Sequence, residues 1–285
     1  MASPRALPLL VSLLALAGCN LLKNPNEPSV PTDTVNYAAL GASDTIGYGG
    51  SAPCLPFIEC MTGTGYVQRT AQRLKATGKT VTLVNLGVPG AVLSPDVQTQ
   101  GNTIGLGILR NLLDDESGYV PKNTTLVTVF IGGNDVNTVG SLIKAGRAGS
   151  DLNAYVQTQT QNFGRDLGLM LAKIRNDVPN ARIIALNLPN MGIIPYAAGR
   201  PADEKRTLQQ ISVGFSAQIS GLSSKGVLVV DLMCDSNFYN PAIFSGDGFH
   251  PNDTGYAYLS DLVYAAASTG ASPAPKASCG FMSAL

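Results

Sequence analysis

The chain has 285 residues, of which 45% are hydrophobic and only 13% are charged. This composition can bury a substantial core, which excludes a disordered chain, and the length fits one domain of about 250 residues. The 19 basic residues balance 19 acidic ones and form no basic run or stripe, so we expect no nucleic-acid partner.

The N-terminal end resembles an export signal. Arg5 precedes an apolar stretch at residues 7–16, which is too short to span a bilayer comfortably. Residues 16–19, Leu-Ala-Gly-Cys, resemble the lipobox of bacterial lipoproteins, in which the cysteine is acylated and becomes the first residue of the mature chain. We predict a signal peptide at residues 1–18 and a lipid anchor on Cys19 that holds the exported protein at a membrane of the bacterial cell envelope. Ordinary secretory cleavage that leaves Cys19 free is the alternative.

Residues 19–36 contain three prolines among polar residues, which suits an extended tether between the membrane and a domain. Residues 37–285 are the predicted catalytic domain, and its tail from residue 268 onward is rich in Ala, Ser and Pro.

Short apolar runs alternate with longer segments of helical period along this domain. Strands are predicted at residues 37–40, 81–86, 126–131, 183–188 and 227–232, and helices at 66–76, 151–176, 203–223 and 254–267. In the second helix an apolar stripe is predicted to form from Leu152, Val156, Phe163, Leu167, Met170 and Ile174. The alternation implies right-handed crossovers and an α/β fold, a three-layer α/β/α sandwich around a parallel sheet of about five strands.

The unusual residues of the chain follow these strands. In an open parallel sheet the carboxyl ends of all strands meet at one edge, where ligands bind. At the successive strand ends stand Ser43, then Gly87 and Gly90, then residues 132–135 (Gly-Gly-Asn-Asp), then Pro189 and Asn190, and finally Asp247 and His250.

His250 is the only histidine, so an imidazole general base must be this residue. Asp247 precedes it by three positions, close enough on a turn to accept the Nδ1 proton and fix the tautomer. The alternative, in which Asp247 only caps a turn, does not explain the glycine-rich strand ends that face this loop. A serine nucleophile would have to lie within reach of the imidazole, and Ser43 is the best candidate. The nucleophile elbow G-x-S-x-G does not occur in the sequence.

Four spaced blocks between residues 37 and 267 resemble those of the SGNH hydrolases, also called GDSL-type esterases and lipases. The blocks are Gly-Ala-Ser-Asp-Thr at 41–45, Asn-Leu-Gly-Val-Pro-Gly at 85–90, Gly-Gly-Asn-Asp at 132–135 and Asp-Gly-Phe-His at 247–250. The resemblance implies a flavodoxin-like α/β/α fold and hydrolysis of esters without a metal or other cofactor. It also implies a role for each matching residue: Ser43 as nucleophile, Asp247 and His250 as the rest of the triad, and Gly90 and Asn134 as oxyanion-hole donors, with Gly87 as a second choice for Gly90. The chain departs from the family at Ala42, where an aspartate is usual, and an acid follows instead at Asp44.

Four cysteines remain besides Cys19, an even number in a chain predicted to be exported. They permit three connectivities, and we favour Cys54 with Cys60 and Cys234 with Cys279, because the first pair closes a short loop. Buried free thiols are the alternative.

We therefore expect a serine esterase that acts on carboxylic esters, either acyl lipids or acetylated carbohydrates. The alternative is a non-catalytic envelope lipoprotein that binds a glycan or lipid. A missing triad residue would favour that alternative, and none is missing. Residues 50–63, 94–119 and 192–201 are expected to shape the pocket.

Overall fold

The computed structural model describes residues 33–57 and 60–285. The predicted signal peptide, Cys19 and nearly all of the predicted tether lie outside the described residues. None of the described helices is both long and apolar enough to cross a bilayer.

The apolar runs form the strands of one parallel sheet. The strands are β1 (Thr34–Gly41), β2 (Thr80–Asn85), β3 (Leu126–Phe130), β4 (Arg182–Leu186) and β5 (Leu228–Val230), in the spatial order β2-β1-β3-β4-β5. Every residue of β3 and β4 is buried, as expected of strands that are covered on both faces. The predicted parallel sheet is confirmed.

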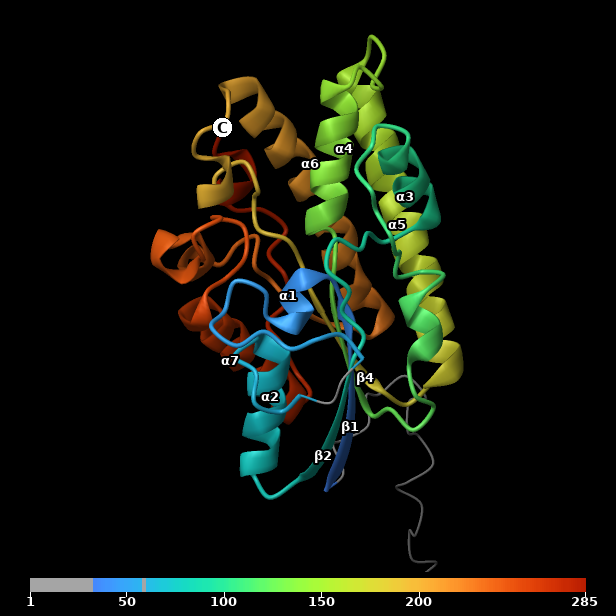
Figure 1. Cartoon of the computed structure of the whole chain (residues 1–285), viewed down its shortest axis with the longest axis vertical. Helices are drawn as coiled ribbons and strands as arrows, with labels where there is room; N and C mark the ends of the chain where they lie inside the picture. The colour runs from blue at the N-terminus through green and yellow to red at the C-terminus, as the bar shows by residue number, and fades with distance from the viewer. Residues whose placement is uncertain (1–32, 58–59) are drawn as a thin grey trace, which may run out of the picture.

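Helices cover both faces of the sheet, and Figure 1 shows them on the two sides of the strands. One layer consists of α2 (Tyr66–Ala76) and α7 (Asp253–Thr269), which pack on each other. The other consists of α4 (Gly133–Lys144), α5 (Leu152–Asp177) and α6 (Ala202–Ser220), and α3 (Pro95–Asn102) packs against α4. The four-residue helix α1 (Ser43–Ile46) follows β1 directly. Short 3₁₀ helices are η1 (Glu116–Tyr119), η2 (Pro195–Ala197), η3 (Gly221–Lys225), η4 (Ser236–Tyr239), η5 (Pro241–Ile243) and η6 (Gly280–Ser283).

The apolar stripe of α5 packs into the core, where the Phe163 ring stacks on Phe215 of α6 with 4.2 Å between ring centroids. Leu152 is an exception and corrects the prediction. It is the first residue of α5, and its side chain stays exposed because no further helical turn lies beyond it to complete the packing.

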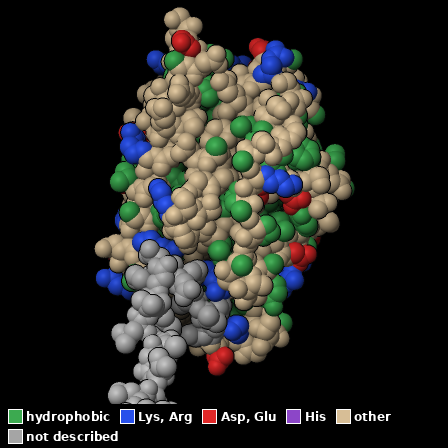
Figure 2. Space-filling view, turned by 180° about the vertical axis from the view of Figure 1, so that it is seen from behind, with side chains coloured by type: hydrophobic (Ala, Val, Ile, Leu, Met, Phe, Trp, Pro, Cys, Tyr) green, Lys and Arg blue, Asp and Glu red, His purple; other side chains and the backbone are tan. Residues whose placement is uncertain are grey.

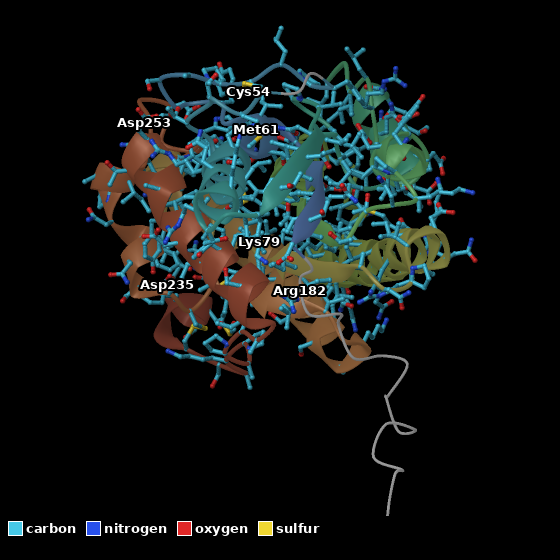
Figure 3. All side chains as sticks on the ribbon, turned by 90° about the horizontal axis from the view of Figure 1, so that it is seen from below. Cys54, Met61, Lys79, Arg182, Asp235 and Asp253 are labelled. Atoms are coloured by element: carbon cyan, nitrogen blue, oxygen red, sulfur yellow. A yellow bond between two sulfur atoms is a disulfide. The ribbon has the colours of Figure 1, made fainter. Side chains whose placement is uncertain are left out.

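Both favoured disulfides are present, Cys54–Cys60 and Cys234–Cys279. Seen along the strands, Cys54 and Met61 lie on the same flank of the molecule as Asp253, the first residue of α7 (Figure 3). The second disulfide holds the Ala/Ser/Pro-rich tail against the sheet edge, where the Lys276 N–H also donates to Asp231 Oδ2 at 2.9 Å.

Candidate active site

Ser43 lies at the carboxyl end of β1, as the first residue of α1. Gly41 makes this sharp turn possible, since its φ is +156° and a Cβ there would come within 2.4 Å of the Phe130 carbonyl oxygen. The side chain of Ser43 is buried, and its Oγ lies 2.8 Å from His250 Nε2. Ala42 stands where an aspartate is usual, and the Tyr48 N–H donates to the Ser43 carbonyl at 3.0 Å.

Asp247 and His250 share a tight turn. Asp247 Oδ2 lies 2.6 Å from His250 Nδ1, and Oδ1 accepts the backbone N–H groups of Phe249 and His250 at 2.8 and 3.0 Å. Burial alone would raise the pKa of Asp247, but the hydrogen bonds from His250, Phe249 and Ser245 outweigh burial and lower that pKa to about 2. The carboxylate is therefore ionised at neutral pH, which favours the tautomer with hydrogen on Nδ1 and leaves Nε2 free to accept from Ser43.

The turn is fixed at Gly248, where φ is +69° and a Cβ would meet the Tyr196 backbone nitrogen at 2.7 Å. The Tyr196 N–H donates to the Gly248 carbonyl at 2.9 Å, which ties the turn to η2. The structure thus brings Ser43, Asp247 and His250 together across more than 200 residues of sequence.

The loop around Gly90 follows β2, and Asn134 follows β3, the two strands that pair with β1 on either side. Asn134 is in the first turn of α4, and its Nδ2 donates to the Ala91 carbonyl at 2.9 Å, which leaves the second amide hydrogen available. Gly90 has a φ of +78°, and its N–H donates no hydrogen bond within the described part of the chain. By contrast, the Gly87 N–H already donates to Asn85 Oδ1 at 3.0 Å, so the geometry favours Gly90 over Gly87 as a free donor.

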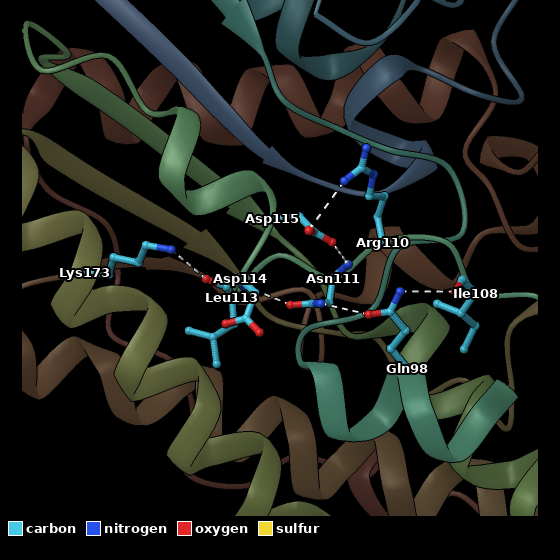
Figure 4. A network of polar contacts seen from close by, with 8 residues as sticks. All are labelled: Gln98, Ile108, Arg110, Asn111, Leu113, Asp114, Asp115 and Lys173. Carbon is cyan, nitrogen blue, oxygen red and sulfur yellow. Dashed lines mark hydrogen bonds and ion pairs between the residues drawn. The ribbon is translucent and has the colours of Figure 1, made fainter. Parts of the chain in front are cut away.

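Residues 110–112 run beside Val92 and support the loop that carries Gly90. The Val92 N–H donates to the Arg110 carbonyl at 3.3 Å, and the Leu112 N–H donates to the Val92 carbonyl at 2.9 Å. Figure 4 shows the polar network that holds the supporting segment, in which Asn111 bonds to Gln98, Asp114 and Asp115 and Lys173 donates to the Leu113 carbonyl.

Asp135 is a positioning residue that the sequence interpretation missed. It is fully buried, and its Oδ1 accepts the Leu93 N–H at 2.9 Å, while its Oδ2 has no hydrogen-bond partner among the described residues. Burial raises the pKa of Asp135 to about 7. The only signal in the sequence was its place after Asn134 in the Gly-Gly-Asn-Asp block.

An apolar pocket opens beside these groups. Its walls include Ala42 and Asp44 on either side of Ser43, Gly133 and Asn134 of α4, and Phe249 beside His250. The remaining lining is largely apolar and buried: Phe130, Ile131, Leu188, Pro189, Met191, Ile194, Phe238 and Pro251, with Gly132. Burial also raises the pKa of the Asp44 carboxyl. Of the three segments expected to shape the pocket, only residues 192–201 contribute to this lining, through Ile194, because the pocket lies on the β3 and β4 side of Ser43.

Among the described residues, no three His, Cys, Asp or Glu side chains are grouped so that they could hold a metal ion.

A model of the GDSL-like lipase/acylhydrolase family matches residues 39–258 of the chain. Among solved structures, the lipase Lip_vut3 from a goat rumen metagenome is similar at 19% identity and a TM-score of 0.55, over 81% of this chain and 97% of that one. A putative GDSL-like lipase from Parabacteroides merdae is similar at 19% identity and a TM-score of 0.53, over 85% and 98% of the two chains. A variant of Axe2, an acetyl xylan esterase from Geobacillus stearothermophilus, has 16% identity and a TM-score of 0.52, over 85% and 99%. At these identities the likeness concerns the fold. No curated protein matches the chain.

Proposed function

This chain belongs to the GDSL-like lipase/acylhydrolase family and is a carboxylic ester hydrolase, and from that premise we propose that it acts through a Ser43–His250–Asp247 triad. The observation that carries the proposal is the continuous line of hydrogen-bonding atoms from Ser43 Oγ to His250 Nε2, at 2.8 Å, and from His250 Nδ1 to Asp247 Oδ2, at 2.6 Å.

The proposed reaction follows from these contacts. Ser43 Oγ attacks the ester carbonyl as His250 Nε2 takes the hydroxyl proton, and the ionised Asp247 stabilises the imidazolium. The imidazolium then protonates the departing alkoxide, which leaves as the alcohol. Water attacks the acyl-enzyme with His250 again as base, and the carboxylic acid is released with Ser43 restored.

We assign the oxyanion hole to the Ser43 and Gly90 N–H groups and to the free hydrogen of the Asn134 amide. Each such donor typically contributes a few kcal/mol to the stability of the transition state. Support comes from the contact of Asn134 with Ala91, which couples the side-chain donor to the loop that carries the Gly90 donor.

The lining of the pocket supports an acyl substrate with an apolar chain. Phe130, Leu188 and Met191 offer no polar group to a sugar, whereas an acyl chain that packs against these buried side chains would leave water. We therefore propose an acyl lipid ester in preference to an acetylated carbohydrate.

One experiment tests the nucleophile and the substrate together. A fluorophosphonate probe should label Ser43 alone, as shown by peptide mapping, and label and turnover should both vanish in Ser43→Ala. Nitrophenyl esters should be hydrolysed faster as the acyl chain lengthens from acetyl, and acetylated sugars should be poor substrates. Labelling of another serine, or full activity in Ser43→Ala, would contradict the triad.

We also propose that residues 1–18 are a signal peptide and residues 19–36 a tether acylated on Cys19, so that the domain at 37–285 is held at a membrane of the cell envelope. The support is the Leu-Ala-Gly-Cys segment at residues 16–19 after a short apolar run.

A further inference from the structure

Large apolar side chains are exposed on the loop that follows α1. Leu55 and Phe57 leave 67% and 56% of their surface in solvent, and Tyr119 of η1, whose ring meets the Phe57 ring edge-on at 6.0 Å, leaves 62%. Tyr48, at the start of the loop, is 50% exposed. We call these four residues the apolar rim.

Backbone contacts and a disulfide fix the described residues of the loop that carry the rim. The Cys54–Cys60 disulfide closes the loop, and the Cys54 N–H donates to the Ile46 carbonyl at 2.8 Å. The Phe57 N–H donates to the Asn85 carbonyl at the end of β2, at 2.9 Å. Phe57 itself has a φ of +59°, an uncommon conformation for a bulky residue that persists only when its surroundings impose it.

The rim is continuous with the candidate active site. The Tyr48 ring packs edge-on against the His250 ring, with 4.7 Å between centroids. Asn85, which holds Phe57, also donates through Nδ2 to the Thr45 carbonyl in α1, at 2.9 Å. A surface that covers the rim would therefore lie next to Ser43.

We propose that the apolar rim docks the protein on a lipid aggregate, a bilayer or micelle that carries the ester substrate. This inference rests on the proposed function, because docking would aid catalysis only if Ser43 hydrolyses an ester that the lipid aggregate carries. The transfer of exposed leucine and phenylalanine side chains from water to hydrocarbon lowers the free energy. Tyrosine, with an apolar ring and a polar hydroxyl, is stable at the boundary between the two.

The pocket on the other side of Ser43 points to lipid and not to a sugar polymer as the partner. Its lining is largely apolar, so a lipid ester that covers the rim can direct its acyl chain at this pocket when its carbonyl meets Ser43. On the face seen from behind Figure 1, hydrophobic side chains lie scattered among polar, Lys and Arg side chains (Figure 2).

The sequence offers a clean test of docking, because it contains no tryptophan. Phe57→Trp, made in a Ser43→Ala background that spares the lipid, places one fluorophore on the rim. Leu169→Trp in the same background is the matched control, since Leu169 is 54% exposed but lies on α5 in the other helix layer. Any lipid on Cys19 is common to both proteins.

With phosphatidylcholine vesicles, the emission of Phe57→Trp should shift to shorter wavelength, and that of Leu169→Trp should not. Absence of a shift at Phe57→Trp, or an equal shift in both proteins, would overturn the proposal. A short-wavelength emission without vesicles, together with a dimer on gel filtration, would also overturn it and would show that a second copy covers the rim.

Kinetics separate docking from the proposed function. In Leu55→Ser/Phe57→Asn, where asparagine tolerates the positive φ, the ratio of kcat/KM on a vesicle-borne long-chain ester to kcat/KM on a soluble short-chain nitrophenyl ester should fall at least tenfold. Leu169→Ser should leave this ratio unchanged. An unchanged ratio in the double variant would refute docking while leaving the triad intact, whereas full turnover in Ser43→Ala would refute the triad.

Discussion

Asp247 has two tasks at the residue scale, one for each carboxylate oxygen. Oδ2 accepts from His250 Nδ1, while Oδ1 accepts from Phe249, His250 and the Ser245 hydroxyl and so shapes the turn that presents the imidazole. The pKa of about 2 follows from this second set of bonds as well as from the imidazole. Since the aspartate orients the ring and also holds the turn, its removal should affect geometry as well as electrostatics.

His250→Ala should lower kcat by roughly 10³-fold or more, because the chain has no second histidine to accept the Ser43 proton. Steady-state kinetics on a soluble nitrophenyl ester provide the measurement, with added imidazole as a chemical-rescue control. Near-normal turnover in His250→Ala would rule out the triad.

At the scale of elements, the sequence predicted the segments in which apolar residues form a continuous run or recur at the period of a helix. The five strands and the long helices fall at the expected places, and α2 has the predicted bounds, Tyr66–Ala76. Helices α3 and α4 were not predicted. Residues of α4 such as Asn137, Thr138 and Gly140 are weak helix formers, and the helix depends on its packing against α6.

At the candidate site, too, some residues could be selected from local motifs, while the roles of others depend on contacts with distant residues. Motifs and strand ends were sufficient to select Ser43, Asp247 and His250, whose catalytic roles stay predictions. The resemblance put Gly90 before Gly87 as an oxyanion donor, but the physical reason was beyond the sequence, because it depends on the side chain of Asn85, which accepts the Gly87 N–H. The role of Asp135 was hidden for a similar reason, since its partner Leu93 lies 42 residues away.

Asp135 joins two elements, α4 and the loop that carries Gly90, and its ionisation should weaken that junction. Its folded-state pKa of about 7 lies above the ordinary value of 3.8, so the native state binds the proton more tightly than the unfolded state does. The resulting stability is fully present below pH 4 and is lost as the pH rises through about 7, by on the order of 4 kcal/mol at most.

Asp135→Asn should remove this loss, since the amide keeps an oxygen for the Leu93 N–H and carries no charge. Urea unfolding at pH 5 and pH 8 measures the effect as the change in unfolding free energy for each protein. If the native protein and Asp135→Asn show the same pH dependence, Asp135 does not titrate as described.

At the scale of the whole molecule, the start of β1 and the candidate site lie at opposite ends of the sheet. The described chain enters β1 at its amino end, whereas Ser43 follows the carboxyl end of the same strand, which is eight residues and about 26 Å long. Residues 20–33 between Cys19 and β1 reach at most about 50 Å when extended. If Cys19 is acylated as proposed, a tether of that reach exceeds the strand and would let the molecule turn its apolar rim toward the membrane.

The last prediction is that Cys19 carries the acyl chains of the anchor. The reason is the Leu-Ala-Gly-Cys segment at residues 16–19, which follows an apolar run too short to cross the membrane. One acyl chain gives only marginal membrane binding, so stable anchoring requires more than one chain or a second contact such as the rim.

In a bacterium fed radioactive palmitate, the native chain should take up label and fractionate with membranes. Cys19→Ser should take up none and lose most of its membrane retention, with Ser43→Ala as a control that keeps both. Label that persists in Cys19→Ser, or never appears in the native chain, would refute the anchor, whereas weak residual vesicle binding by unlabelled Cys19→Ser is what the rim alone should provide.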